Sequence, residues 1–170
     1  MMDFYISIKR NSSLEKFRVK KEYDANLDGI YSILFDICNF IDGHVDFLVS
    51  GFGDSHWPVD VRTDLPSFIE QIPKCKILAE AGRDFSLNFY EQGVQRTVEF
   101  SRSSGAYTAT CTSGCSWVPR PQTVTLECLS VSKMLEDVLM EFSDIVMIVA
   151  PEIYDGLWFS RWLRGTEHTD

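Results

Sequence analysis

The chain has 170 residues, and its 25 acidic side chains outnumber its 16 basic ones, which gives a formal net charge of −9. A hydrophobic content of 45% excludes general disorder, and the length predicts one domain over residues 1–170, with an ordered core to residue 164 and a frayed tail at 165–170. The negative charge argues against nucleic acid and anionic membranes as partners, because both require a basic surface.

The N-terminal segment predicts a strand and not a secretory signal. Phe4, Ile6 and Ile8 alternate with polar side chains, which is the period of a strand with one buried face. Asp3 precedes these apolar residues and two basic residues follow them, whereas a secretory signal places its positive charge first. Residues 17–21 are predicted as a second, basic strand or as one arm of a hairpin. We expect a cytoplasmic protein.

Two long amphipathic helices are predicted. The first covers residues 24–42, with Asp24 as its N-cap and Gly43 just after its last turn. The second covers residues 130–149, begins at one of two serines and ends before Pro151. Both carry apolar side chains at spacings of three and four, so each is expected to bury one face.

Shorter elements are predicted around these helices. Residues 45–50 form a short apolar strand, and residues 65–72 form a short helix that ends at Pro73. Residues 153–163, which contain two tryptophans, are expected to form a short helix packed on the core.

The middle of the chain has the period of antiparallel strands. Between residues 76 and 128, apolar side chains such as Phe85, Leu87 and Phe89 alternate with polar ones, and glycine turns separate the runs. Arg96 interrupts the apolar face of one of these strands. We predict an α+β fold: an antiparallel β-sheet meander of about five to seven strands, packed on one side against the two long helices.

The cysteines and histidines give no sign of a metal or cofactor. The number of cysteines is odd, at five, and most of them lie among apolar residues, which favours reduced thiols in the cytoplasm. Cys111 and Cys115 form the only close pair, and no second Cys/His pair lies at zinc spacing. No phosphate-binding loop, dinucleotide fingerprint or metalloprotease motif is present. We expect no cofactor and no enzyme activity.

The acidic residues are concentrated in two parts of the chain. Residues 22–73 contain ten acids and one base, and residues 134–170 contain eight acids and two bases. The rest of the chain is close to neutral or basic. Surface helices usually mix charges, because oppositely charged pairs four residues apart stabilise a helix by about 0.2–0.5 kcal/mol each. The sequence therefore indicates a negative surface that meets a basic protein partner, although acid content can also serve solubility alone.

The predicted partner-binding residues lie on the two helices and on the loop between them. Trp57 stands in a Gly/Pro-rich loop among aspartates, and tryptophan is enriched at the centres of protein interfaces. The predicted set is Asp28 and Asp36 on the first helix, Asp54, Trp57, Asp60 and Asp64 in and after the loop, and Glu141 and Asp144 on the second helix.

Two other readings remain open. Gly53, Asp54 and Ser55, followed by His56, resemble the Gly-Asp-Ser start of the GDSL hydrolases, in which the serine is the nucleophile, although the Asp-x-x-His motif of that family is missing. A turn explains the same residue types. An acidic scaffold or accessory protein without catalysis is the third reading. It predicts acidic faces that lie far apart or are matched by basic residues within the fold.

The whole profile resembles the immunity proteins of bacterial contact-dependent inhibition and related polymorphic toxin systems. The resemblance rests on a small acidic α+β domain without a catalytic motif and on two stretches, Phe-Leu-Val-Ser-Gly-Phe-Gly-Asp at 47–54 and Leu-Trp-Phe-Ser-Arg-Trp-Leu at 157–163. It implies a protein that binds a cognate toxin, often a basic nuclease, and neutralises it by covering the active site or substrate channel.

Overall fold

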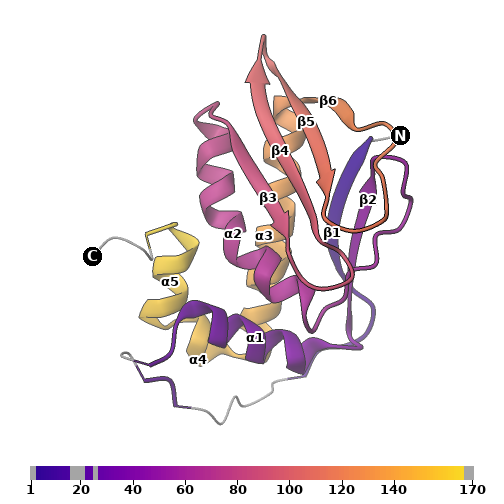
Figure 1. Ribbon diagram of the computed structural model, residues 1–170. Coiled ribbons are helices and arrows are strands. Elements are labelled where there is room, and N and C mark those ends of the chain that lie inside the picture. The colour runs from indigo at the N-terminus through magenta and orange to yellow at the C-terminus, as the bar shows by residue number, and fades with distance from the viewer. Residues whose placement is uncertain (1–2, 16–21, 25–26, 167–170) are drawn as a thin grey trace.

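The computed structural model describes residues 3–15, 22–24 and 27–166. The predicted strand at 17–21 and the last four residues of the predicted tail lie outside these ranges. Within them, six strands form two antiparallel sheets and are accompanied by five helices (Figure 1). The fold is therefore α+β, as the sequence predicts, but its strands do not join into a single sheet.

The larger sheet confirms the predicted meander. Its four strands are consecutive in the chain and pair in sequence order: β3 (Phe85–Phe89), β4 (Arg96–Ser103), β5 (Ala106–Ser113) and β6 (Thr123–Glu127). Side chains alternate between buried and exposed along each strand, so one face packs on the core.

The other two strands form a separate ribbon. β1 (Phe4–Arg10) pairs antiparallel with β2 (Val45–Gly51) along the whole of both strands, and among the described strands neither pairs with any other. The ribbon meets the larger sheet through side chains instead, with the rings of Phe4 and Phe100 6.1 Å apart. The prediction of five to seven strands in one sheet was wrong, because alternation in sequence shows which face is buried and not which edges pair.

Two long helices pack behind the sheets, side by side in Figure 1: α2 (Asp64–Glu80) and α3 (Cys128–Val149). The remaining helices lie together near one end of the molecule: α1 (Ile30–Ile41), α4 (Pro151–Tyr154) and α5 (Leu157–Leu163). The second predicted helix is close to α3, whereas the first is shortened to α1 and the short helix before Pro73 is extended to α2. The prediction of which two helices are long was therefore wrong for one of them.

Local and tertiary effects explain these two differences. α1 begins after Gly29, whose backbone is extended. Asp24 precedes the helix, and its carbonyl accepts hydrogen bonds from the amides of Leu27 and Asp28. Glycine disfavours a helix interior by about 1 kcal/mol relative to alanine. α2 continues through Pro73 despite a typical cost of about 3 kcal/mol. Pro73, Cys75 and Ala79 are buried there, so packing offsets the lost backbone hydrogen bond.

An aromatic cluster fills the core where the ribbon meets the larger sheet. Trp57 is 1% exposed, and its ring lies 5.9 Å from Phe4 and 5.2 Å from Phe89. The loop after β2 turns back sharply to place it there. Phe52 adopts a positive φ of 56°, and the backbone at Gly53 lies so close to the Arg120 carbonyl that a Cβ would be 2.0 Å from that oxygen.

Candidate functional site

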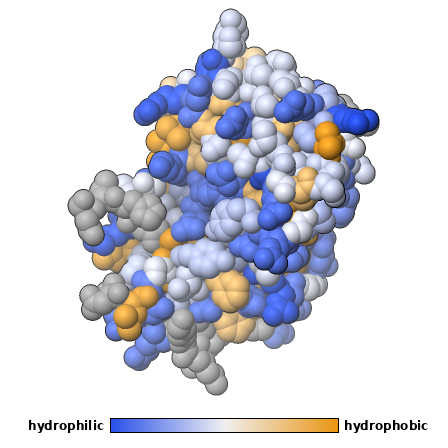
Figure 2. Space-filling model, in the orientation of Figure 1, coloured by the Kyte–Doolittle hydropathy of each residue, from blue (hydrophilic) through white to orange (hydrophobic). Residues whose placement is uncertain are grey.

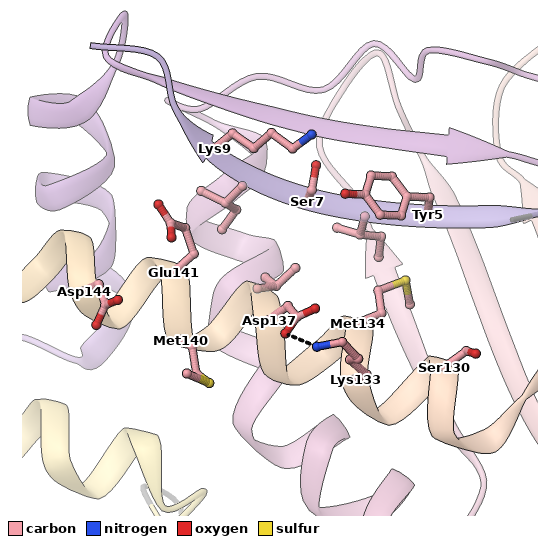
Figure 3. Close-up of a pocket in the computed structure, with 13 residues that line it drawn as sticks. Tyr5, Ser7, Lys9, Ser130, Lys133, Met134, Asp137, Met140, Glu141 and Asp144 are labelled. Atoms are coloured by element: carbon pink, nitrogen blue, oxygen red, sulfur yellow. Dashed lines mark hydrogen bonds and ion pairs between the residues drawn. The ribbon is translucent and has the colours of Figure 1, made fainter. Parts of the chain in front are cut away.

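A groove of about 460 Å³ runs between β1 and α3 (Figure 3). One wall consists of five consecutive β1 residues, 5–9, and the other is a single stripe along α3. Both faces of a strand line a groove in this way only when the groove runs along the strand's edge. The helix wall comprises Ser130, Lys133, Met134, Asp137, Val138, Met140, Glu141 and Asp144.

The spacing of residues on α3 produces this wall. Its members recur at intervals of three and four, so they lie along one side of the helix. Met134 and Val138 belong to the core, as do Ile6 and Ile8 of β1. Polar side chains of the same stripe, such as Asp137 and Asp144, remain exposed. The groove therefore has an apolar floor and a charged helix rim.

The backbone of β1 presents hydrogen-bonding groups to this groove. The Val49 carbonyl accepts a hydrogen bond from the Trp57 amide at 2.9 Å, so it points away from β1. Val49 pairs with Ile6, and in an antiparallel ladder both residues of such a pair direct their N–H and C=O groups outward. Ile6 and, by the alternation, Ile8 therefore direct their backbone groups toward the unpaired edge.

Ion pairs occupy part of the groove. Arg10 Nε lies 2.7 Å from a carboxylate oxygen of Glu141, which links β1 to α3, and Lys133 Nζ lies 3.0 Å from Asp137 Oδ1 on the helix surface. Asp144 is exposed and forms no ion pair with any other residue that the structure describes. The helix wall carries three carboxylates and one ammonium group, so its charge is negative.

Ser7 adds a polar group without a partner. The residue is 8% exposed and lines the groove, and its Oγ forms no hydrogen bond with the described residues. A buried hydroxyl without a partner typically costs about 1–3 kcal/mol. The oxygen itself is buried, so in this conformation it belongs to the interior beside the groove and not to the accessible surface of the groove.

The predicted role of Trp57 as a surface anchor is contradicted by its position. Its ring is enclosed by the aromatic cluster, and its indole nitrogen donates to the Gly51 carbonyl at 3.2 Å. A side chain that is 1% exposed offers no area to a partner in this conformation. The composition of the loop predicted an interface role for Trp57, but it could not show whether the side chain points to solvent or into the core.

Asp54 mainly stabilises the fold, through an ion pair with Arg96. One of its carboxylate oxygens lies 2.9 Å from Arg96 Nη1, and Arg96 is only 4% exposed. The guanidinium carbon lies 3.6 Å from the ring centre of Trp117 and 4.5 Å from that of Trp57. This cluster explains why an arginine interrupts the apolar face of β4: its charge is matched by one carboxylate and two aromatic faces.

Asp60 lies just before α2, and Asp64 is the first residue of that helix. Asp60 is exposed and accepts hydrogen bonds from the backbone and hydroxyl of Thr63, at 2.7 and 2.9 Å, which lower its pKa. Asp64 is 4% exposed and accepts the Asp60 amide at 2.8 Å. Burial, together with the charges of Asp60 and Glu91, raises the pKa of Asp64 to about 6. Asp64 is therefore a structural carboxyl and, against the prediction, no surface contact.

The two predicted residues near the first helix remain partly exposed. Asp36 accepts a hydrogen bond from the Tyr23 hydroxyl at 3.0 Å, and Asp28 accepts one from the Asp24 amide at 2.9 Å. Both carboxylates have local hydrogen-bonding roles, and both keep surface that a partner can reach.

The eight predicted residues thus fall into three groups, near α1, after β2 and on α3. Only Glu141 and Asp144 line the large groove. Sequence reasoning missed the β1 residues of the opposite wall, Tyr5, Ser7 and Lys9. The polar half of the β1 alternation was the available signal, but nothing in the sequence places it beside α3.

The Gly-Asp-Ser segment has the geometry of a turn. Asp54 Oδ1 accepts the His56 amide at 3.0 Å, and Ser55 and His56 are both exposed. Ser55 lines neither the groove nor a second cavity of about 430 Å³ between α2, β3 and α5. A short contact between a serine and a histidine ring occurs elsewhere, at 2.7 Å between Ser12 Oγ and His44 Nδ1 on the exposed surface.

The other chemical groups give little further indication of a site. The five cysteines are free thiols, and no cluster of three metal-ligating side chains occurs among the described residues. Within the same residues, none of the helices has the length and apolar character needed to cross a bilayer. The face seen in Figure 2 is mainly hydrophilic, with apolar side chains in scattered patches.

Comparisons with family models, with curated proteins and with solved structures found no match to this chain.

Proposed function

We propose that this protein binds and neutralises a basic protein partner, as an immunity protein does with its cognate toxin. In this proposal, the acidic surface on α3 covers the active site or substrate channel of the partner, which is a basic nuclease. The observation that carries it is the position of Glu141 and Asp144 on the rim of the groove between β1 and α3, where one wall is a strand edge that pairs with no other described strand.

Charge gives the proposal its physical basis. The helix wall is negative, and Asp144 is exposed without an ion pair among the described residues. A nuclease channel is positive because it holds phosphates, so the two surfaces would attract each other and increase the rate of encounter. Burial of Trp57 and Asp64 moves the expected contact away from the start of α2 and toward α3.

Growth rescue tests the proposal. On this proposal, the neighbouring gene encodes a secreted protein with a toxic C-terminal domain; that domain is expressed in a host cell, with and without this chain, and growth is measured. We expect rescue by the natural chain and loss of rescue by the Glu141→Lys/Asp144→Lys double variant. Glu136→Lys, an exposed position of the same helix outside the groove, is the matched control and should still rescue. Rescue by the double variant would contradict the proposal.

A further inference from the structure

We propose that the groove binds an extended segment of the basic partner, which adds as a further strand to the unpaired edge of β1. This inference rests on the proposed function for the charge of the partner, and it specifies how the partner is held. The groove's two walls, a strand edge and a helix, are the two surfaces that such a segment would contact.

The backbone of β1 has the hydrogen-bonding pattern that strand addition needs. Ile6 and Ile8 both direct an N–H and a C=O toward the edge, which offers an added strand up to about four ladder hydrogen bonds. Edge strands with unpaired backbone groups are templates for pairing with another chain. The five lining residues of β1 would extend about 16 Å, enough for a segment of about five residues.

The position of α3 favours an extended segment over a helix or a flat surface. An added strand would continue the β1–β2 ribbon, and alternate side chains of that strand would point toward α3 (Figure 3). Met134 and Met140 lie on this wall, and methionine adapts to apolar side chains of different shape. The groove would therefore accept a range of apolar residues at these positions.

Charge favours a basic side chain on the α3 side of the groove. Asp137, Glu141 and Asp144 follow one another along the helix wall at spacings of four and three, with Lys133 at the other end, whereas the cation Lys9 lies on the β1 wall. Asp137 and Glu141 already have ion-pair partners, so Asp144 is the carboxylate that a lysine or arginine of the segment would meet.

Synthetic heptapeptides test the proposal on the full chain. The probe is acetyl-Val-Lys-Val-Lys-Val-Lys-Val-amide, compared with its glutamate counterpart and with a backbone N-methylated version that keeps the charges. We expect the lysine peptide to bind about tenfold more tightly than either comparison peptide, because only it combines backbone donors with positive charge. Equal binding of the N-methylated peptide would overturn strand addition, and equal binding of the glutamate peptide would overturn the basic specificity.

Amide hydrogen exchange locates the bound peptide. With saturating lysine peptide, the amides of Ile6 and Ile8 should exchange about tenfold more slowly, whereas those of Tyr5 and Ser7, already paired with β2, should change little. Binding without added protection of Ile6 and Ile8 would overturn the proposal.

Two pairs of variants test the contributions of the β1 wall and the α3 wall to peptide binding separately. Ile6→Pro removes the N–H that points to the groove, whereas Ile6→Ala loses more side-chain packing but keeps that donor. We expect the proline variant to bind the peptide at least fivefold more weakly than the alanine variant, and equal affinities would overturn strand pairing. If Ile6→Pro does not fold, Asp144→Lys supplies a second test. It should weaken binding about fivefold, against less than twofold for Glu136→Lys.

Failure of this inference can be distinguished from failure of the proposed function. If the complete partner is neutralised through Glu141 and Asp144 while the Ile6 and Ile8 amides gain no protection, strand addition is wrong and the proposed function stands. If the lysine peptide protects these amides but the double charge reversal leaves growth rescue intact, the groove binds a strand and the proposed function is wrong.

Discussion

Carboxylates occur both in the loop after β2 and along α3, and the two regions use them differently. In the loop, Asp54 is paired with a nearly buried arginine that two tryptophans enclose. On α3, Glu141 and Asp144 stand on the rim of a groove, and Asp144 has no ion pair among the described residues. Similar acidic residues thus stabilise the interior in one region and shape an accessible surface in the other.

This comparison shows what decides the role of a charge in this fold. Desolvation makes an uncompensated buried charge costly, so Arg96 is stable only beside Asp54 and the aromatic faces. An exposed carboxylate is solvated and costs little, and it remains available to a partner.

The largest expected effect is at the centre of the aromatic cluster. Trp57→Ala removes a 1% exposed indole and should reduce the free energy of unfolding by about 3–5 kcal/mol, measured by urea denaturation. The folded fraction should bind the partner as before. A stable variant with lost binding would instead make the loop an interface and remove the distinction between the two regions.

Breaking the buried ion pair should have the next largest effect. Arg96→Met leaves Asp54 without its cation and should reduce stability by about 2–4 kcal/mol, while Asp54→Asn combined with Arg96→Met should recover part of that loss. A double-mutant cycle in urea measures this coupling. If the effects of the two substitutions on the free energy of unfolding simply add, Asp54 does not stabilise Arg96 and behaves as an ordinary surface carboxylate.

Asp64 should give the loop region a pH dependence. Burial raises its pKa from 3.8 to about 6 in the folded protein, so the folded state retains this proton over a range where the unfolded chain loses it. The corresponding stabilisation is complete below about pH 4 and disappears as the pH rises through 6.

Asp64→Asn removes this ionisation and keeps an oxygen that can accept the Asp60 amide. At pH 7.5 we expect the variant to be more stable than the natural chain by about 1–3 kcal/mol, and at pH 4 the two should be close. Melting temperatures across pH 4–8 measure the difference. A difference in melting temperature that does not change with pH would contradict the raised pKa of Asp64.

The smallest effect on stability is expected at the groove. Asp144→Lys should change the free energy of unfolding by less than about 0.5 kcal/mol, and Lys133→Ala, which breaks an exposed pair four residues apart, should cost about 0.3–0.5 kcal/mol. Thermal denaturation checks both. A loss above about 2 kcal/mol in Asp144→Lys would show that this carboxylate has a structural role, as Asp54 does.

Much of the local structure could be predicted from the sequence. Period-two alternation predicted β1 and the meander, and spacings of three and four predicted α3 and the buried face of α1. The extension of α2 through Pro73 could not be predicted, because the loss at the proline is local whereas the burial that offsets it involves residues far away in the chain. Of the residues that line the groove, the sequence singled out only Glu141 and Asp144, as members of the predicted partner-binding set.

The sequence by itself determined the α+β class, the concentration of acid in two segments and the buried faces of β1, the meander strands and α3, because these depend on composition and on short-range periodicity. Only the tertiary structure decided that the strands divide into two sheets, that Trp57 and Asp64 are buried, and that the edge of β1 lies beside α3. Edge pairing, burial of a loop side chain and the walls of a groove all depend on contacts between residues distant in the chain, which local periodicity does not record.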